Sequence, residues 1–265
     1  VPDCNCAVIK VHNHNMTRLP IVVNLMTALR KVEVVNGPLR VLDDDFGSQA
    51  PTLSVLIMDF NRLKSFPDSI SKMASLHTLY MGFNEIEYIP SGLWTLPELY
   101  DLDLQDNRIG TAFEEVRIGL PNLHHMHLSN NSIAKLPKAW VSPSLTMLHA
   151  GGNNISTIPH YFSSFTNLQL LYLSRNQLNS TSFEVGFDTL SVLDVRNNSL
   201  RSFPLWFGSV RFLYAAGNPI CAGNSATSCA PQCSEYCNDY LLQNAGCDFE
   251  CNSKVCNFDK GQCSL

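Results

Sequence analysis

The 265-residue chain has few charged residues: Asp, Glu, Lys and Arg make up 15% of it, against about 25% in typical soluble domains. The net charge is −5 and no basic block occurs, which argues against nucleic acid as a partner. No run approaches the roughly 18 consecutive apolar residues of a membrane-spanning helix. We therefore expect any membrane attachment only through segments outside this chain. An initiator Met and a signal-peptide pattern are also missing, so we expect a mature or trimmed fragment.

Cysteine is missing from the whole stretch 7–220 and is concentrated at the two ends of the chain. Cys4 and Cys6 precede this stretch, and eight more Cys lie between Cys221 and Cys263. Such end clusters indicate caps held by disulfides in an oxidising compartment, so we expect the secretory pathway and an extracellular or cell-surface location. A zinc site is the weaker interpretation, because the C-terminal cluster contains no His and no pair of C-x2-C motifs.

The stretch without Cys is built on one eleven-residue frame, L-x-x-L-x-L-x-x-N-x-L. Clear copies begin at Leu53, Leu76, Leu99, Leu123, Leu145, Leu168 and Leu190, and weaker ones at Cys6, Leu29 and Val210. Successive copies start about 20 to 24 residues apart, which is the period of leucine-rich repeats. From residue 1 to about 220, the chain therefore resembles a leucine-rich repeat protein.

This resemblance implies an α/β solenoid, a leucine-rich repeat horseshoe of about ten repeats with a parallel sheet on its concave face. The apolar frame positions face inward, and one repeat cannot bury them without its neighbours. The frame Asn ends each strand, and its amide can both donate to and accept from backbone groups of the flanking turns. His14 and Gly37 replace this Asn in the first two repeats, so we expect the N-terminal end of the array to be the looser one.

We divide the chain into four parts. Residues 1–28 form an N-terminal cap with the first repeat, and residues 29–220 form the repeats. Residues 221–232 form a C-terminal cap or linker, in which Cys221 and Cys229 are the natural local pair. Residues 233–265 form a small cysteine-rich module. The partners of Cys4 and Cys6 stay open.

The last module has the spacing Cys233-x3-Cys237-x9-Cys247-x3-Cys251-x4-Cys256-x6-Cys263, which resembles a Lin-12/Notch repeat (LNR). Spacing alone leaves fifteen pairings open. The resemblance implies the disulfides Cys233–Cys256, Cys237–Cys251 and Cys247–Cys263. It also implies a calcium site at Asp239, Asn244 and Asp259, since oxygen ligands suit this ion. Gln262 stands where the family has its last Asp ligand, which should weaken the binding of calcium.

Frame positions three, five and seven should point away from the core, and adjacent repeats should align them in columns. The column at position five is rich in Tyr, Asp and His and poor in Lys, a composition typical of recognition surfaces. The alternative interpretation is an ordinary solvent-exposed sheet face without a ligand. We predict that a ligand binds to Tyr80, Tyr100, Asp101, Asp103, His125, His127, His149, Tyr172 and Asp194.

Two catalytic interpretations of the same face are weaker. His125, His127 and His149 could converge on zinc, but the sequence identifies neither a base nor a closed pocket. Asp103, His127 and Ser129 could form a triad, but His127 and Ser129 lie about 6.8 Å apart along one strand and no nucleophile elbow is present. We therefore predict that the chain is not an enzyme.

Five sequons avoid the buried Asn position of the frame, so a glycan could be accommodated at each. They begin at Asn15, Asn130, Asn154, Asn179 and Asn197. The favoured function is extracellular recognition of a protein, peptide or glycan, as a receptor ectodomain or a secreted binder. The alternatives are a structural protein of a cell wall or matrix, and an accessory recognition domain of a larger enzyme.

Overall fold

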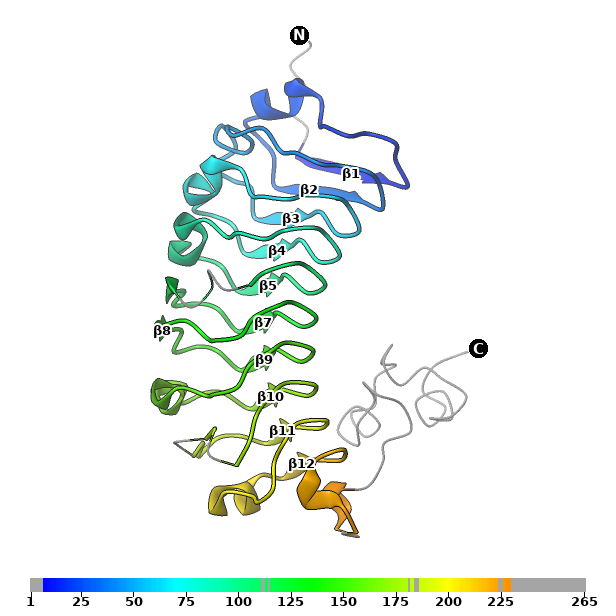
Figure 1. Cartoon of the computed structure of the whole chain (residues 1–265). Coiled ribbons are helices and arrows are strands. Elements are labelled where there is room, and N and C mark those ends of the chain that lie inside the picture. Colours follow the sequence, from blue (N-terminus) through cyan, green and yellow to red (C-terminus); the bar gives the residue numbers. More distant parts are fainter. Residues whose placement is uncertain are drawn as a thin grey trace, which may run out of the picture.

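The fold is a stack of ten short parallel strands, one for each copy of the frame. The computed structural model describes residues 7–110, 113, 115–180, 182–183, 186–223 and 226–229. The strands are β1 (Val8–His12), β2 (Lys31–Val35), β3 (Val55–Ile57), β4 (Thr78–Tyr80), β5 (Asp101–Asp103), β7 (His125–His127), β9 (Met147–His149), β10 (Leu170–Tyr172), β11 (Val192–Asp194) and β12 (Phe212–Tyr214). They pair in this order in one sheet, which runs the length of the stack in Figure 1. The predicted solenoid with a parallel sheet is confirmed.

Equivalent frame positions face each other across every pair of strands. Leu56 lies opposite Leu79, and Leu79 lies opposite Leu102. All three side chains are fully buried, and each such burial contributes about 1.5–3 kcal/mol. The residues on either side of them in β3, β4 and β5 are only half-buried and lie on the opposite face of the sheet. The alternation therefore separates a continuous core from a row of columns that face away from it.

The frame Asn residues link the turn of one repeat to the turn of the next. The side-chain amide of Asn84 donates to the carbonyls of Met58, Met81 and Gly82, and its oxygen accepts from the backbone N–H of Leu63. The same kind of contact recurs along the stack at Asn61, Asn107, Asn131, Asn153, Asn176, Asn198 and Asn218. Each Asn thus provides the partner for one backbone N–H of the preceding repeat and joins carbonyls of two successive turns.

His14 fills the Asn position of the first repeat in a different way. Its Nδ1 accepts a hydrogen bond from the backbone N–H of Met16 at 3.1 Å, within its own repeat. A Cβ on Gly37 would lie 2.2 Å from the ring of His14. Glycine is therefore required in the second repeat because the histidine of the first occupies the space. That the N-terminal end is looser stays a prediction.

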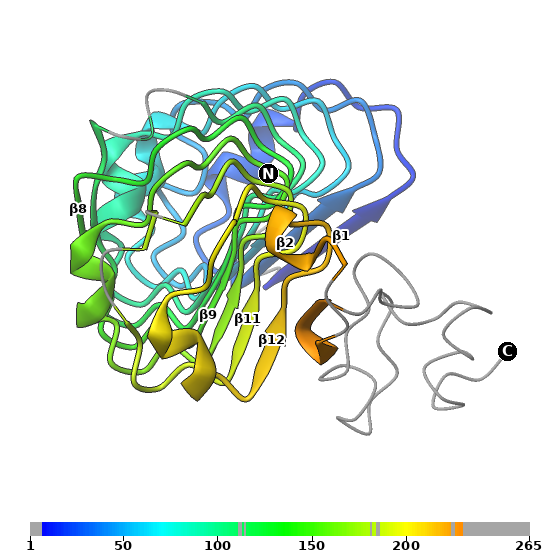
Figure 2. The ribbon, with the colours of Figure 1, turned by 60° about the horizontal axis from the view of Figure 1, so that its bottom comes forward.

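Short 3-10 helices form the return side of the solenoid, opposite the sheet (Figure 2). They are η1 (Ile21–Leu25), η2 (Asp68–Lys72), η3 (Ser91–Thr95), η5 (His160–Ser164) and η6 (Leu205–Ser209). The residue immediately before each is a proline, namely Pro20, Pro67, Pro90, Pro159 and Pro204. The expected α/β class needs this refinement, because the described residues contain no α-helix. Arms of five residues are too short for a stable α-helix.

Two features complete the outer side and the end of the stack. Strands β6 (Arg117–Gly119) and β8 (Ala139–Val141) pair in parallel on the return side, apart from the main sheet. At the end of the array, η7 (Pro219–Cys221) and η8 (Thr227–Cys229) carry a disulfide between Cys221 and Cys229, with Cα atoms 5.3 Å apart. The backbone N–H of Ala215 donates to the carbonyl of Ser228, so this segment closes the end of the sheet.

Candidate recognition surface

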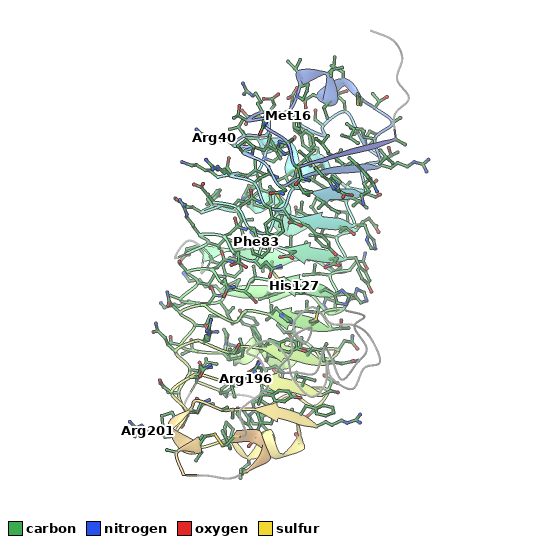
Figure 3. All side chains as sticks on the ribbon, turned by 90° about the vertical axis from the view of Figure 1, so that its right-hand side faces the viewer. Met16, Arg40, Phe83, His127, Arg196 and Arg201 are labelled. Carbon is green, nitrogen blue, oxygen red and sulfur yellow. A yellow bond between two sulfur atoms is a disulfide. The ribbon has the colours of Figure 1, made fainter. Side chains whose placement is uncertain are left out.

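The face of the sheet opposite the core, which we call the concave face, carries the predicted columns. In the column at frame position five, Tyr80 lies opposite Asp103, Asp103 opposite His127, and His127 opposite His149. His149 in turn lies opposite Tyr172. The structure therefore brings these residues side by side from five consecutive repeats. Figure 3 labels His127 midway along the stack.

One row of stacked rings runs along the entry edge of the strands. The ring of Tyr100 lies between those of His77 and His124, with centroid distances of 4.8 and 4.1 Å and nearly parallel planes. His125 meets Tyr100 edge-on at 5.5 Å. Stacked rings hold one another in fixed orientations, so a partner binding there would meet a surface that is already ordered.

A second row of rings occupies the position-five column. The ring centroids of His127 and His149 are 4.7 Å apart, and those of His149 and Tyr172 are 3.9 Å apart. Burial, and secondarily the neighbouring His127, hold the pKa of His149 well below its ordinary value. A neutral imidazole at neutral pH can stack on both neighbours without the desolvation cost of a buried charge.

Carboxylates gather beside the first ring row. The hydroxyl of Tyr80 donates to Oδ2 of Asp101 at 2.6 Å, and the backbone N–H of Gln105 donates to Oδ1 of Asp103 at 2.9 Å. Oδ1 of Asp59 accepts from the backbone N–H of Gly82 at 2.8 Å. Burial, and then repulsion by Asp103, raise the pKa of Asp59 to about 7. Burial also raises the pKa of Asp103.

The raised pKa of Asp59 makes stability depend on pH. Below the ordinary pKa of 3.8 the carboxyl is protonated in both folded and unfolded states. As the pH rises towards 7, the unfolded chain releases this proton first, and the contribution to stability is lost. Asp59→Asn should therefore raise the free energy of unfolding by roughly 1–3 kcal/mol at pH 8 and by much less at pH 4.

Urea denaturation at the two pH values measures this difference. The exposed carboxylate Asp188 provides a matched control, since Asp188→Asn removes the same charge without relieving a buried group. An equal gain in both variants, or a gain for Asp59→Asn that is the same at pH 4 and pH 8, would contradict the assignment.

Two of the predicted ligand-binding residues, in the last repeats of the concave face, are buried. Asp194 is 2% exposed and Arg196 6% exposed. The guanidinium Nε and Nη2 of Arg196 donate to the carboxylate of Asp194 at 2.6 to 3.1 Å. Tyr172 is 8% exposed and packs in one buried cluster with Val192 and Tyr214. We correct the predicted surface accordingly: Asp194 and Tyr172 support its C-terminal boundary and do not offer side chains to solvent.

Two exposed phenylalanines border the same face and were missed by the sequence analysis. Phe60 and Phe83 follow β3 and β4 in the turn, both at positive φ, 56° and 53°. Such a conformation costs a bulky residue about 1–2 kcal/mol. Their rings stack with centroids 4.2 Å apart. The signal was present in the frame, since position eight otherwise holds Asn, Asp, Arg or Gly.

The catalytic interpretations gain no support from the geometry. Across the described residues, no group of three or more His, Cys, Asp and Glu side chains could hold a metal ion. The rings of His127 and His149 stack instead of converging on a common point. Asp103 accepts hydrogen bonds from the backbone and side-chain amides of Gln105. In a catalytic triad, the carboxylate would instead accept a hydrogen bond from the histidine.

Several predicted residues lie outside the described part of the chain. These are Cys4, Cys6, the calcium candidates Asp239, Asn244 and Asp259, and the six Cys of the LNR-like module. Of the predicted glycosylation sites, Asn15, Asn154, Asn179 and Asn197 are exposed. Asn130 is half-buried, and its amide donates to both carboxylate oxygens of Asp106, so a glycan there would break this contact. Where the chain is described, it contains no helix long and apolar enough to cross a bilayer.

The chain has the solenoid fold and the repeated frame that leucine-rich repeat proteins share. A family model described as "Leucine rich repeat" matches residues 97–155 and 121–178. The chain is also similar to lumican of Gallus gallus, with 26% identity over 254 residues that cover 83% of this chain and 73% of lumican. Osteomodulin of Bos taurus is 29% identical over 209 residues, covering 77% of this chain and 49% of osteomodulin.

Among solved structures, the TLR13–ssRNA13 complex superposes with a TM-score of 0.62 and 24% identity. The match covers 73% of this chain and 29% of the TLR13 chain. This likeness concerns the fold alone. It shows that the arrangement of repeats is shared, while the partner of the present chain has to be argued from its own residues.

Proposed function

We propose that the chain is an extracellular recognition module that binds a protein or peptide through the concave face between β3 and β9. The observation that carries this proposal is the row of stacked rings of His77, Tyr100 and His124, which His125 meets edge-on. Tyr and His rings that no core contact requires provide large, rigid and amphipathic contact area. The absence of long, flexible Lys side chains from the centre of the face reduces the entropy lost on binding.

The compartment follows from the cysteine chemistry. The disulfide between Cys221 and Cys229 supports an oxidising environment, because such bonds are rare in reducing compartments. The exposed sequon Asn residues would accept glycans without disturbing the ladder. The proposal assigns no reaction to this chain, and it leaves receptor ectodomain and secreted binder as two forms of the same role.

Nucleic acid and glycan are less favoured partners. The TLR13 structure was solved with single-stranded RNA, but the outward positions of β5 here carry Asp101 and Asp103, which would repel phosphates. A glycan could stack on the row of Tyr100, and it is kept as an outcome of the binding test. A purely structural role in a matrix or wall remains the alternative function.

The test is an array of purified extracellular proteins and glycans probed with the native chain and two double variants. Tyr100→Ala/His124→Ala removes the centre of the first ring row. Tyr88→Ala/His160→Ala removes the same side-chain types from exposed positions of the return arms. We expect the first variant to weaken binding at least 30-fold, about 2 kcal/mol, and the second to leave it within threefold.

Three outcomes would count against the proposal. Equal losses in both variants would place the contact elsewhere or reflect misfolding, which circular dichroism and the thermal midpoint would reveal. A native chain that binds nothing on the array would favour the structural role. Hits confined to the glycans would keep the concave face but replace the protein partner.

A further inference from the structure

The turn that follows each strand forms a column of its own, and two members of it differ from the rest. The residue at frame position eight, in this turn, has positive φ in every repeat. In most repeats it is Asn or Gly, which accept this conformation readily. In the third and fourth repeats the position holds Phe60 and Phe83. No feature of the backbone asks for an aromatic ring there, because the same turn forms around Asn36 and Asn130.

The two rings are not part of the core. Phe60 is 53% exposed and Phe83 38% exposed. The rings lie nearly parallel, at 9°, so they form one apolar stack, which we call the shelf, beside the concave face. Figure 3 shows Phe83 on the same side of the molecule as His127. Exposed apolar surface held in a strained conformation is typical of a contact site.

Carboxylates border this shelf at close range. Asp59 directly precedes Phe60, and Gly82 directly precedes Phe83. A Cβ on Gly82 would lie 3.5 Å from an oxygen of Asp59 and 3.5 Å from an oxygen of Asp103. The side chain of Gln105 lies at 3.3 Å from the same point, so Gly82 is a closely packed position that brings two carboxylates from different repeats near each other.

The neighbouring outward positions hold no Lys or Arg side chain. Neither Lys nor Arg occupies frame position three, five or seven in the repeats of β3, β4 and β5, all of which the structure describes. A ligand at this corner would therefore find an apolar stack on one side and the carboxyl groups of Asp59 and Asp103 on the other, and a cation beside these carboxyl groups would favour their ionised form. Charge complementarity favours a cation next to an apolar group.

We propose that Phe60, Phe83, Asp59 and Asp103 form a docking corner for a segment of a partner protein in which a Lys or Arg adjoins an apolar side chain. The apolar side chain packs on the stacked rings of Phe60 and Phe83. The cation pairs with the half-buried carboxylates of Asp59 and Asp103. The inference rests on the proposed concave-face function and specifies the partner chemistry at one end of it.

The experiment is a selection of random dodecapeptides displayed on phage, with the native chain as bait, followed by binding measurements on the enriched peptides. We expect enrichment of peptides with Lys or Arg within two residues of Leu, Phe or Trp. Phe60→Asn/Phe83→Asn should weaken their binding at least tenfold. Asn is the residue that other repeats use in this turn, so this variant should keep the fold. Tyr88→Asn removes an exposed aromatic ring elsewhere and should leave binding within twofold.

The cation is tested by pairing a change in the chain with a change in the peptide. Asp59→Asn/Asp103→Asn and replacement of the peptide cation by Gln should each weaken binding at least fivefold. Both together should weaken it little more than either alone, because the same interaction is removed twice. Fully multiplicative losses would show that the cation binds elsewhere and would overturn the assignment.

Other outcomes separate this inference from the proposed function. Enriched peptides without a cation, or the absence of any enrichment, would overturn the docking corner. Peptides that are lost with Tyr100→Ala/His124→Ala but kept with Phe60→Asn/Phe83→Asn would overturn it while supporting the concave face. A dimer in sedimentation that dissociates in Phe60→Asn/Phe83→Asn would identify a second copy of this chain as the occupant instead.

Discussion

Asn107→Ala should lower the free energy of unfolding by about 3 kcal/mol or more. The amide of Asn107 donates to the carbonyls of Met81, Leu104 and Gln105, and its oxygen accepts from the N–H of Ile86. Alanine leaves the N–H of Ile86 without its partner at the centre of the array. It also removes one of two hydrogen bonds from each carbonyl, since Met81, Leu104 and Gln105 keep those from Asn84, Asn131 and Phe83. A buried group without a partner costs about 1–3 kcal/mol, and each further lost hydrogen bond about 0.5–1.5 kcal/mol.

Urea denaturation of the native and variant chains measures this loss. Asn122 is the matched control, because its amide makes one exposed hydrogen bond, to the carbonyl of Pro97. Asn122→Ala should cost less than 1 kcal/mol. Similar losses in the two variants would mean that the Asn ladder contributes no more than a surface contact, and the account of repeat coupling would fail.

Asp194→Ala is expected to cost about 3–5 kcal/mol, because it leaves the guanidinium of Arg196 buried without its partner. The two side chains share three charge-assisted hydrogen bonds, and both residues are buried. Replacing both residues together by apolar ones, Asp194→Leu/Arg196→Met, should cost less than the single change. An ion pair replaced whole is often nearly neutral.

The exposed pair of Lys138 and Glu115 provides the comparison. Its atoms are as close, at 2.6 Å, but both side chains are more than half exposed. Glu115→Ala should therefore change stability by less than about 1 kcal/mol. The thermal midpoints of the native chain, Asp194→Ala, the double variant and Glu115→Ala measure these differences in stability. If the double variant is as unstable as Asp194→Ala, packing around these side chains outweighs the unpaired charge.

The frame of the sequence predicted the stack and its columns because both follow from short-range rules. A strand alternates its faces, so Leu102 is buried while Asp101 and Asp103 face away. The Asn position was equally readable, since an amide at a strand end can satisfy two turns. The pair of Asp194 and Arg196 could also have been found, because residues two apart on a strand share a face.

Other features depended on contacts that no local rule contains. Tyr172 is buried because it packs with Val192 and Tyr214. The periodicity of the frame does not predict such side-chain contacts between repeats. The pKa of Asp59 depends on its burial and then on Asp103, two repeats away. The stacking of Phe60 on Phe83 required the turn geometry, although their unusual place in the frame was visible.

The most direct test of the central claim, that the concave face is the binding surface, is chemical footprinting of the histidines with a partner bound. Diethylpyrocarbonate modifies accessible imidazoles, and the rates at His77, His124 and His160 can be followed by mass spectrometry. The partner would be the tightest protein found on the array. We predict that it slows modification of His77 and His124 at least fivefold and leaves His160, on the return side, unchanged. Protection of His160 with no change at His77 and His124 would contradict the account.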